Sequence, residues 1–160
     1  MPDFQVLRYE LSLAEQSLKH KIDIVVLLQP TSPLRSLNLL DEAVQKVKRG
    51  DFTSIWSISE VPIKYHPRKQ LEIRSEKLVL SVDSPLVRAR QELTSTFIRN
   101  GVCYVFTRDT VFSDKKLMGS KCGYVKITSE TFNIDELEDL KRLRVRTEIN
   151  NNQLTLKERR

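Results

Sequence analysis

The sequence predicts an α/β fold built on a mostly parallel sheet, and three patterns along the chain point to it. A continuous apolar run within residues 22–28 is typical of a strand that helices cover on both faces. An amphipathic segment at 37–49 predicts a helix, and a shorter apolar segment at 53–59 predicts the next strand. A helix between two strands is a βαβ unit, whose crossover is right-handed and whose strands run parallel.

The flanking segments fit the same class. Residues 8–19 carry apolar side chains near helical spacing and predict an amphipathic helix before the first strand. Pro30 and Pro33 remove backbone donors and end that strand. Gly50 is placed to cap the end of the second helix.

The middle of the chain predicts a small β excursion over about residues 67–96. Two short apolar runs, 71–73 and 78–82, flank a polar turn and indicate a β-hairpin that projects from the main sheet. Further strands are predicted at 97–106 and 123–127.

A charged helix is predicted at 136–146, with Asp135 as its N-cap and Glu138 three positions later. Residues 148–160 are expected to form a tail. Basic residues gather on this helix and in the tail, which is most simply a solvated surface. Nucleic-acid binding is a further interpretation, but no aromatic residues interleave with these charges to stack on bases.

Composition limits the class of protein. The 160 residues predict a single domain, and 39% apolar and 30% charged residues fit a globular chain with a net charge of +6. No stretch approaches the roughly 18 apolar residues that span a membrane. Cys103 and Cys122 lack the spacing of metal ligands, and we expect reduced thiols in a cytoplasmic protein.

The segment after the first strand carries the chemistry of a candidate site. In an open α/β sheet, ligands bind at the carboxyl ends of the strands, where residues 29–35 begin. Gln29, Thr31 and Ser32 offer hydrogen-bonding groups, and Arg35 offers a forked cation for a carboxylate or phosphate. From these residues alone, a plain strand-to-helix connection is as good an interpretation as a binding loop.

Residues 28–35, Leu-Gln-Pro-Thr-Ser-Pro-Leu-Arg, closely resemble the signature of the acylneuraminate cytidylyltransferases. This family makes CMP-sialic, CMP-legionaminic and CMP-pseudaminic acids. Three further blocks are similar to family motifs and stand in family order: His-Pro-Arg-Lys at 66–69, Arg-Ala-Arg-Gln-Glu-Leu at 88–93 followed by Asn-Gly-Val-Cys-Tyr at 100–104, and Asn-Ile-Asp at 133–135 followed by Asp139.

The resemblance implies a Rossmann-like nucleotidyltransferase fold of the nucleotide-diphospho-sugar transferase type. It implies transfer of CMP from CTP to a sialic-acid-type (nonulosonic) sugar acid, with release of pyrophosphate and help from Mg²⁺. It also implies a homodimer in which the excursion reaches toward the neighbour's site. From the composition and charge pattern we expect neither nucleic acid nor membrane as a partner. The implied substrate-binding residues are Gln29, Pro30, Thr31, Ser32, Arg35, Lys69, Arg90, Gln91, Asn100 and Tyr104.

Each of these residues has an ordinary alternative. A lone arginine in a hairpin is commonly a solvated charge, Tyr104 in an apolar strand is commonly core, and Asn100 with Gly101 is commonly a turn. No residue is assigned catalysis.

The chain departs from the family in two ways. The Gly-Ser-Lys loop that cradles the CTP phosphates in the family has no counterpart at the start, so we expect the chain to begin about a third of the way into a family member, with an exposed sheet edge. Asn133 stands where the family has a metal-binding carboxylate, which leaves Asp135 for Mg²⁺. Two hypotheses follow: an enzyme of this family, or a non-catalytic remnant that only binds a ligand or pairs with a partner.

Overall fold

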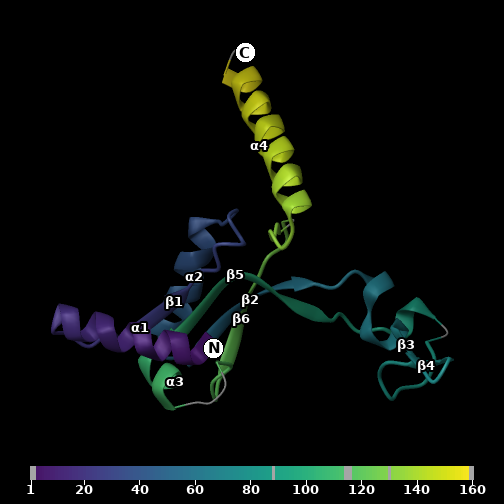
Figure 1. The fold of residues 1–160 in the computed structure, drawn as a ribbon, viewed down its shortest axis with the longest axis horizontal. Coiled ribbons are helices and arrows are strands. Elements are labelled where there is room, and N and C mark those ends of the chain that lie inside the picture. The colour runs from purple at the N-terminus through teal and green to yellow at the C-terminus, as the bar shows by residue number, and fades with distance from the viewer. Residues whose placement is uncertain (1–2, 88, 114–116, 130, 159–160) are drawn as a thin grey trace.

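The protein folds around a four-stranded sheet with the strand order β1-β5-β2-β6, near the centre of Figure 1. The structure, a computed structural model, describes residues 3–87, 89–113, 117–129 and 131–158, with the backbone alone at residue 3 and at 148–158. The strands are β1 (Ile24–Leu27), β2 (Ser54–Glu60), β5 (Phe97–Thr107) and β6 (Cys122–Lys126). The predicted α/β class is confirmed.

The sheet is mixed, whereas the sequence predicted mostly parallel pairing. Strands β1 and β2 both pair antiparallel with β5 and therefore share one direction, and β6 pairs parallel with β2. Helix α2 (Leu37–Lys48) connects β1 to β2 as predicted, but these two strands are not neighbours. β5 lies between them, and its residues 100–106 are all buried, as suits a central strand.

Strand β1 lies at an edge of the sheet, so the prediction of a strand covered on both faces is wrong for part of it. Val26 is 40% exposed, and Leu28, just after the strand, is 41% exposed. Among the described strands β1 pairs only with β5. An apolar sheet edge of this kind is what the sequence led us to expect.

Helices cover both faces of the sheet. On one face α2 buries Ala43 and Val47 against β5 and its neighbours. On the other face lie α1 (Asp3–Leu18) and α3 (Arg108–Ser113), which bury Leu11 and Val111 against Phe106. Helix α3 was not predicted, because six residues are too few to show a helical period. None of the described helices has the length and apolar character needed to cross a membrane.

The β excursion predicted between β2 and β5 is present and projects from the sheet at the right of Figure 1. Its hairpin pairs β3 (Leu71–Arg74) with β4 (Lys77–Leu80), and Ser75 and Glu76 make the turn with positive φ. Three 3-10 turns surround the hairpin: η1 (Ile63–Tyr65), η2 (Pro67–Lys69) and η3 (Arg90–Glu92). Buried His66 fastens its base by a 3.1 Å contact between its Nε2 and the Thr94 carbonyl.

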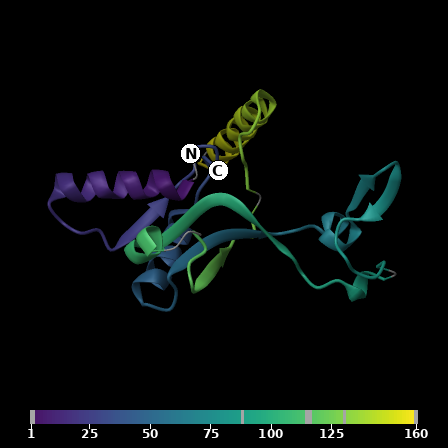
Figure 2. The ribbon, with the colours of Figure 1, turned by 60° about the horizontal axis from the view of Figure 1, so that its bottom comes forward.

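Helix α4 (Leu137–Glu158) extends away from the sheet, as Figures 1 and 2 both show. It is longer than the predicted 136–146, and residues 148–158, expected to be a tail, are helical; residues 159 and 160 lie outside the described part. Lys141, Arg142 and Arg144 are exposed on it. This agrees with a solvated basic surface.

Candidate functional site

The loop after β1 is folded back on itself by its own polar groups. The Ser32 amide donates to the Gln29 carbonyl at 3.1 Å, which forms a tight turn across Pro30 and Thr31. The guanidinium of Arg35 donates to the same carbonyl and, through Nε, to the Val102 carbonyl at 3.0 Å. Arg35, a predicted ligand-binding cation, therefore fastens the loop to β5.

The segment around Asn133 lies against this loop, although about a hundred residues separate them in sequence. Buried Ser32 donates from Oγ to Asn133 Oδ1 at 2.6 Å. The Ile134 amide donates to the Thr31 carbonyl at 2.8 Å. The first and last motifs of the sequence are thus joined at the carboxyl end of β1.

Asn100 and Gly101 form a bulge in β5. The register pairs Trp56 with Tyr104 and Ile58 with Arg99, so residues 100–103 lie opposite the single residue Ser57. Buried Asn100 holds the bulge: its Oδ1 accepts from Ser57 Oγ at 2.6 Å, and its Nδ2 donates to Ser59 Oγ at 2.9 Å. These bonds give Asn100 a structural role, which agrees with the turn interpretation.

The bulge lets β5 approach the loop. Gly101 has φ of +75°, in the left-handed region, and a β-carbon there would meet the side chains of Gln29 and Ser32. Glycine therefore allows Gln29 to lie directly on the bulge.

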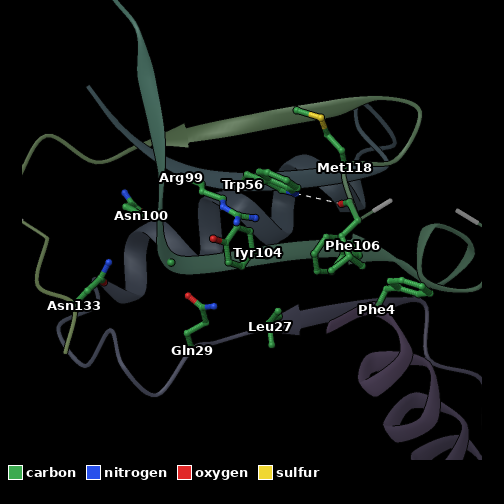
Figure 3. Close-up of a pocket in the computed structure, with 12 residues that line it drawn as sticks. Phe4, Leu27, Gln29, Trp56, Arg99, Asn100, Tyr104, Phe106, Met118 and Asn133 are labelled. Atoms are coloured by element: carbon green, nitrogen blue, oxygen red, sulfur yellow. Dashed lines mark hydrogen bonds between the residues drawn. The ribbon is translucent and has the colours of Figure 1, made fainter. Parts of the chain in front are cut away.

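A pocket of about 540 Å³ opens at this junction, on the α1 side of the sheet. In Figure 3 the amide side chains of Gln29, Asn100 and Asn133 lie at one end of the pocket, and the apolar side chains of Phe4, Phe106 and Met118 lie at the other. It is lined by Phe4, Leu27, Gln29, Trp56, Arg99, Asn100, Gly101, Tyr104, Phe106, Leu117, Met118 and Asn133. Tyr104 meets the Trp56 ring edge to face, with 5.5 Å between centroids, and Trp56 Nε1 donates to the Leu117 carbonyl at 3.2 Å. Tyr104 is thus both a core residue, 8% exposed, and part of the pocket wall.

Arg99 is a pocket residue that the sequence analysis missed. It is the one charged side chain among the twelve described lining residues. It is exposed and extends from β5 into the pocket in Figure 3. Its position directly before the Asn-Gly pair could have indicated a site residue. An arginine within a predicted strand, however, is ordinarily interpreted as a solvent-facing residue.

The predicted site residues fall into two separate groups. Gln29, Asn100, Tyr104 and Asn133 share the pocket, and Ser32 and Thr31 support its rim. Lys69, Arg90 and Gln91 lie in the excursion, are exposed, and contribute nothing to the described lining of the pocket. Arg88, at the head of the same motif, lies outside the described residues.

The described residues do not form a metal centre by themselves. No group of three potential ligands from His, Cys, Asp and Glu occurs in the described part of the chain. Asp135 is exposed, and Asn133 Oδ1 already accepts from Ser32. Asp139, the last residue of the fourth motif, makes the N-terminal cap of α4: its Oδ2 accepts from the amides of Asp135 and Glu136 at 3.2 and 3.1 Å. The prediction of Asp135 as the capping side chain is therefore wrong.

Comparisons with known proteins agree with the motifs. No protein-family model matches the sequence. The N-acylneuraminate cytidylyltransferase of Oncorhynchus mykiss is 26% identical over 117 residues, which are 71% of this chain and 26% of the relative. The match thus spans about a quarter of that relative's length.

Among solved structures, a CMP:2-keto-3-deoxy-manno-octonic acid synthetase complexed with CTP superposes with a TM-score of 0.58 and 14% identity. The superposition covers 86% of this chain and 67% of that one, which establishes a common fold. The motifs in their order and the similarity to an N-acylneuraminate cytidylyltransferase point to the same family, and the superposition shows a shared fold.

Proposed function

We propose that this chain provides the sugar-acid side of a cytidylyltransferase active site. In the proposed reaction the anomeric hydroxyl of a sialic-acid-type sugar acid attacks the α-phosphate of CTP, and pyrophosphate leaves. The observation that carries the proposal is the pocket at the carboxyl end of β1, where Gln29 and Tyr104 from two motifs meet. Ligands of open α/β sheets bind at such ends.

The chemistry of the pocket suits a substituted sugar acid. Gln29 and Asn133 present amides that can serve sugar hydroxyls as donors and acceptors. The opposite end presents apolar surface from Leu27, Trp56 and Phe106, against which an N-acyl methyl group or a deoxy position would pack. The similarity to an N-acylneuraminate cytidylyltransferase supports this class of substrate.

The described pocket is poorly equipped for a triphosphate. Its described lining has one cation, Arg99, and no carboxylate to hold Mg²⁺. Stabilisation of phosphate charge is usually the largest contribution to phosphoryl transfer. This favours the second hypothesis for the isolated chain, in which it binds the sugar acid without transferring CMP. CTP binding, and Mg²⁺ brought with its phosphates, would require groups beyond those that line this pocket.

We further propose a homodimer formed through the excursion. An isolated two-stranded hairpin is only marginally stable in water. This hairpin also exposes large apolar side chains, which favours burial against another protein surface. Ile73 is 78% exposed and Leu78, paired with it across the hairpin, is 70% exposed. A neighbouring chain that covers them would also bring Lys69 and Arg90 of one protomer toward the pocket of the other.

Calorimetric titration with N-acetylneuraminate tests the binding function. The chain should bind the sugar acid, and Gln29→Ala should weaken that binding by about 5- to 20-fold, the value of one or two hydrogen bonds. Gln16→Ala, an exposed glutamine of α1, is the matched control and should bind like the parent chain. Absence of any binding to the parent chain would refute the proposal.

A pyrophosphate-release assay with CTP, Mg²⁺ and N-acetylneuraminate separates the two hypotheses. We expect no release above background from the isolated chain. Clear turnover would show that the chain is a complete enzyme and would remove the non-catalytic alternative.

A further inference from the structure

Arg99 is the strongest unassigned feature of the pocket. The residues on the described wall are otherwise neutral, so its positive charge meets no carboxylate there. No hydrogen bond or ion pair engages its guanidinium within the part of the chain that the structure describes. A cation that faces a pocket without a partner is a natural site for an anionic group of a ligand.

The backbone fixes where this charge points. Arg99 stands immediately before the bulge, and its register partner is Ile58 of β2. The bonds of Asn100 to Ser57 and Ser59 lock the bulge from the buried side. Arg99 and Tyr104 therefore flank the bulge and both line the pocket (Figure 3).

The other candidate arginines are placed for different tasks. Arg35 donates to the carbonyls of Gln29 and Val102, so its fork is engaged with backbone. Arg90 lies in η3 of the excursion, outside the pocket of its own chain. Among the described residues of one protomer, Arg99 is thus the arginine that lines the pocket.

We propose that Arg99 binds the carboxylate of the sugar acid and so makes this pocket selective for acidic over neutral sugars. A single guanidinium matches a single carboxylate in charge and in planar, two-point geometry. A nucleoside triphosphate would need several cations to balance its phosphate charges, and the described lining offers only one. This inference rests on the proposed function, because it names the group that recognises the acid.

The test compares three probes by calorimetry: N-acetylneuraminate, its methyl ester, in which the carboxylate is neutralised, and CMP. The variants are Arg99→Met, which removes charge at similar length, and Arg99→Lys, which keeps charge without the fork. Arg142→Met, at an exposed arginine of α4, is the control. Thermal unfolding of each variant verifies that it is folded.

We expect the parent chain to bind the acid about 10- to 100-fold more tightly than the ester, the range of a charge-assisted hydrogen-bonded pair. Arg99→Met should weaken binding of the acid by that factor and leave binding of the ester unchanged. Arg99→Lys should fall between, and Arg142→Met should match the parent. A merely structural role for Arg99 would weaken acid and ester alike.

The remaining outcomes overturn the inference in distinguishable ways. Equal binding of the acid by the parent and Arg99→Met would refute the role of Arg99 and leave the proposed function standing. If Arg99→Met weakened CMP and not the acid, the anion would be a phosphate, and the carboxylate assignment would be wrong. If the parent chain bound neither the acid nor CMP, the inference and the proposed function would fall together.

Discussion

The side-chain oxygen of Gln29 occupies the space that a β-carbon on residue 101 would need, so Gly101 determines where Gln29 lies. Gly101→Ala should displace the Gln29 amide and also strain a backbone with φ of +75°. We expect a loss of about 1–3 kcal/mol in the free energy of unfolding and weaker binding of N-acetylneuraminate. Urea unfolding and calorimetry measure the two effects.

Gly50→Ala is the matched control for this substitution. Gly50 also has a positive φ, of +82°, but nothing lies within 4 Å of a β-carbon there. Gly50→Ala should therefore lower the free energy of unfolding by about 1 kcal/mol, through backbone strain alone, and should bind the sugar acid like the parent chain. Equal effects on binding from both variants would contradict the assigned role of Gly101.

Asn133 provides a second test, because its oxygen is already held by Ser32 Oγ at 2.6 Å. In Asn133→Asp a carboxylate would accept the same hydrogen bond, so the fold should be kept, and Asp135 would gain an anionic neighbour. An added unit charge about 4 Å from a divalent cation is worth about 2 kcal/mol in a water-like dielectric. We expect Mg²⁺ or Mn²⁺ affinity to rise more than about tenfold over the parent chain.

Manganese titration followed by electron paramagnetic resonance measures that gain. Asn38→Asp adds the same charge at an exposed position of α2 and should leave metal affinity unchanged. If both variants gained equally, the effect would be one of net charge, and positions 133 and 135 would not form a metal site.

The ion pair between Glu15 and Arg108 predicts how stability depends on pH. Hydrogen bonds from Arg108, at 2.7 and 3.0 Å, and from the Ile22 amide lower the pKa of Glu15 from 4.5 to about 2. A carboxyl whose pKa is lower in the folded state stabilises the fold above its unfolded pKa. That contribution is complete above about pH 4.5 and is lost as the pH falls toward 2.

Urea unfolding of the parent chain and Glu15→Gln over pH 2.5–7 checks this. The parent should be the more stable above about pH 5, and the difference between the two should shrink steadily below pH 4.5. Glu10→Gln, at an exposed position of the same helix, should show no such pH-dependent difference. A constant difference for Glu15→Gln across the range would refute the coupling.

The order of most elements could be predicted from the sequence because each of these has its own local signal. The apolar run of β1, the face of α2 and the polar turn between β3 and β4 all depend on residues close together in the chain. The position of β5 between β1 and β2 could not be predicted, since strand order is set by packing between distant segments. Helix α3 and the full length of α4 lacked a periodic signal.

The candidate site, like the fold, could be predicted from the sequence only in part. The loop after β1 and the Asn-Gly pair were found because their residue types are distinctive. Arg35, predicted to bind the ligand, bonds to backbone carbonyls, and Arg99, which lines the pocket, was missed, since charge alone does not reveal which arginine bonds to the backbone. That distinction depends on the bulge in β5, which only the register of the two strands reveals.

The hairpin of the excursion predicts the oligomeric state. Ile73 and Leu78 face each other across β3 and β4 and are 78% and 70% exposed, so their burial against a second chain would remove apolar surface from water. Ile73→Asp should place an unpaired charge in that interface and weaken the dimer by more than about 100-fold. Sedimentation equilibrium of parent and variant measures the dissociation constant.

Leu137→Asp, on an equally apolar residue that is 71% exposed at the start of α4, should leave the dimer intact. A monomeric parent chain, or equal loss of association in both variants, would remove the excursion as the dimer contact and with it the route by which Arg90 could reach a pocket.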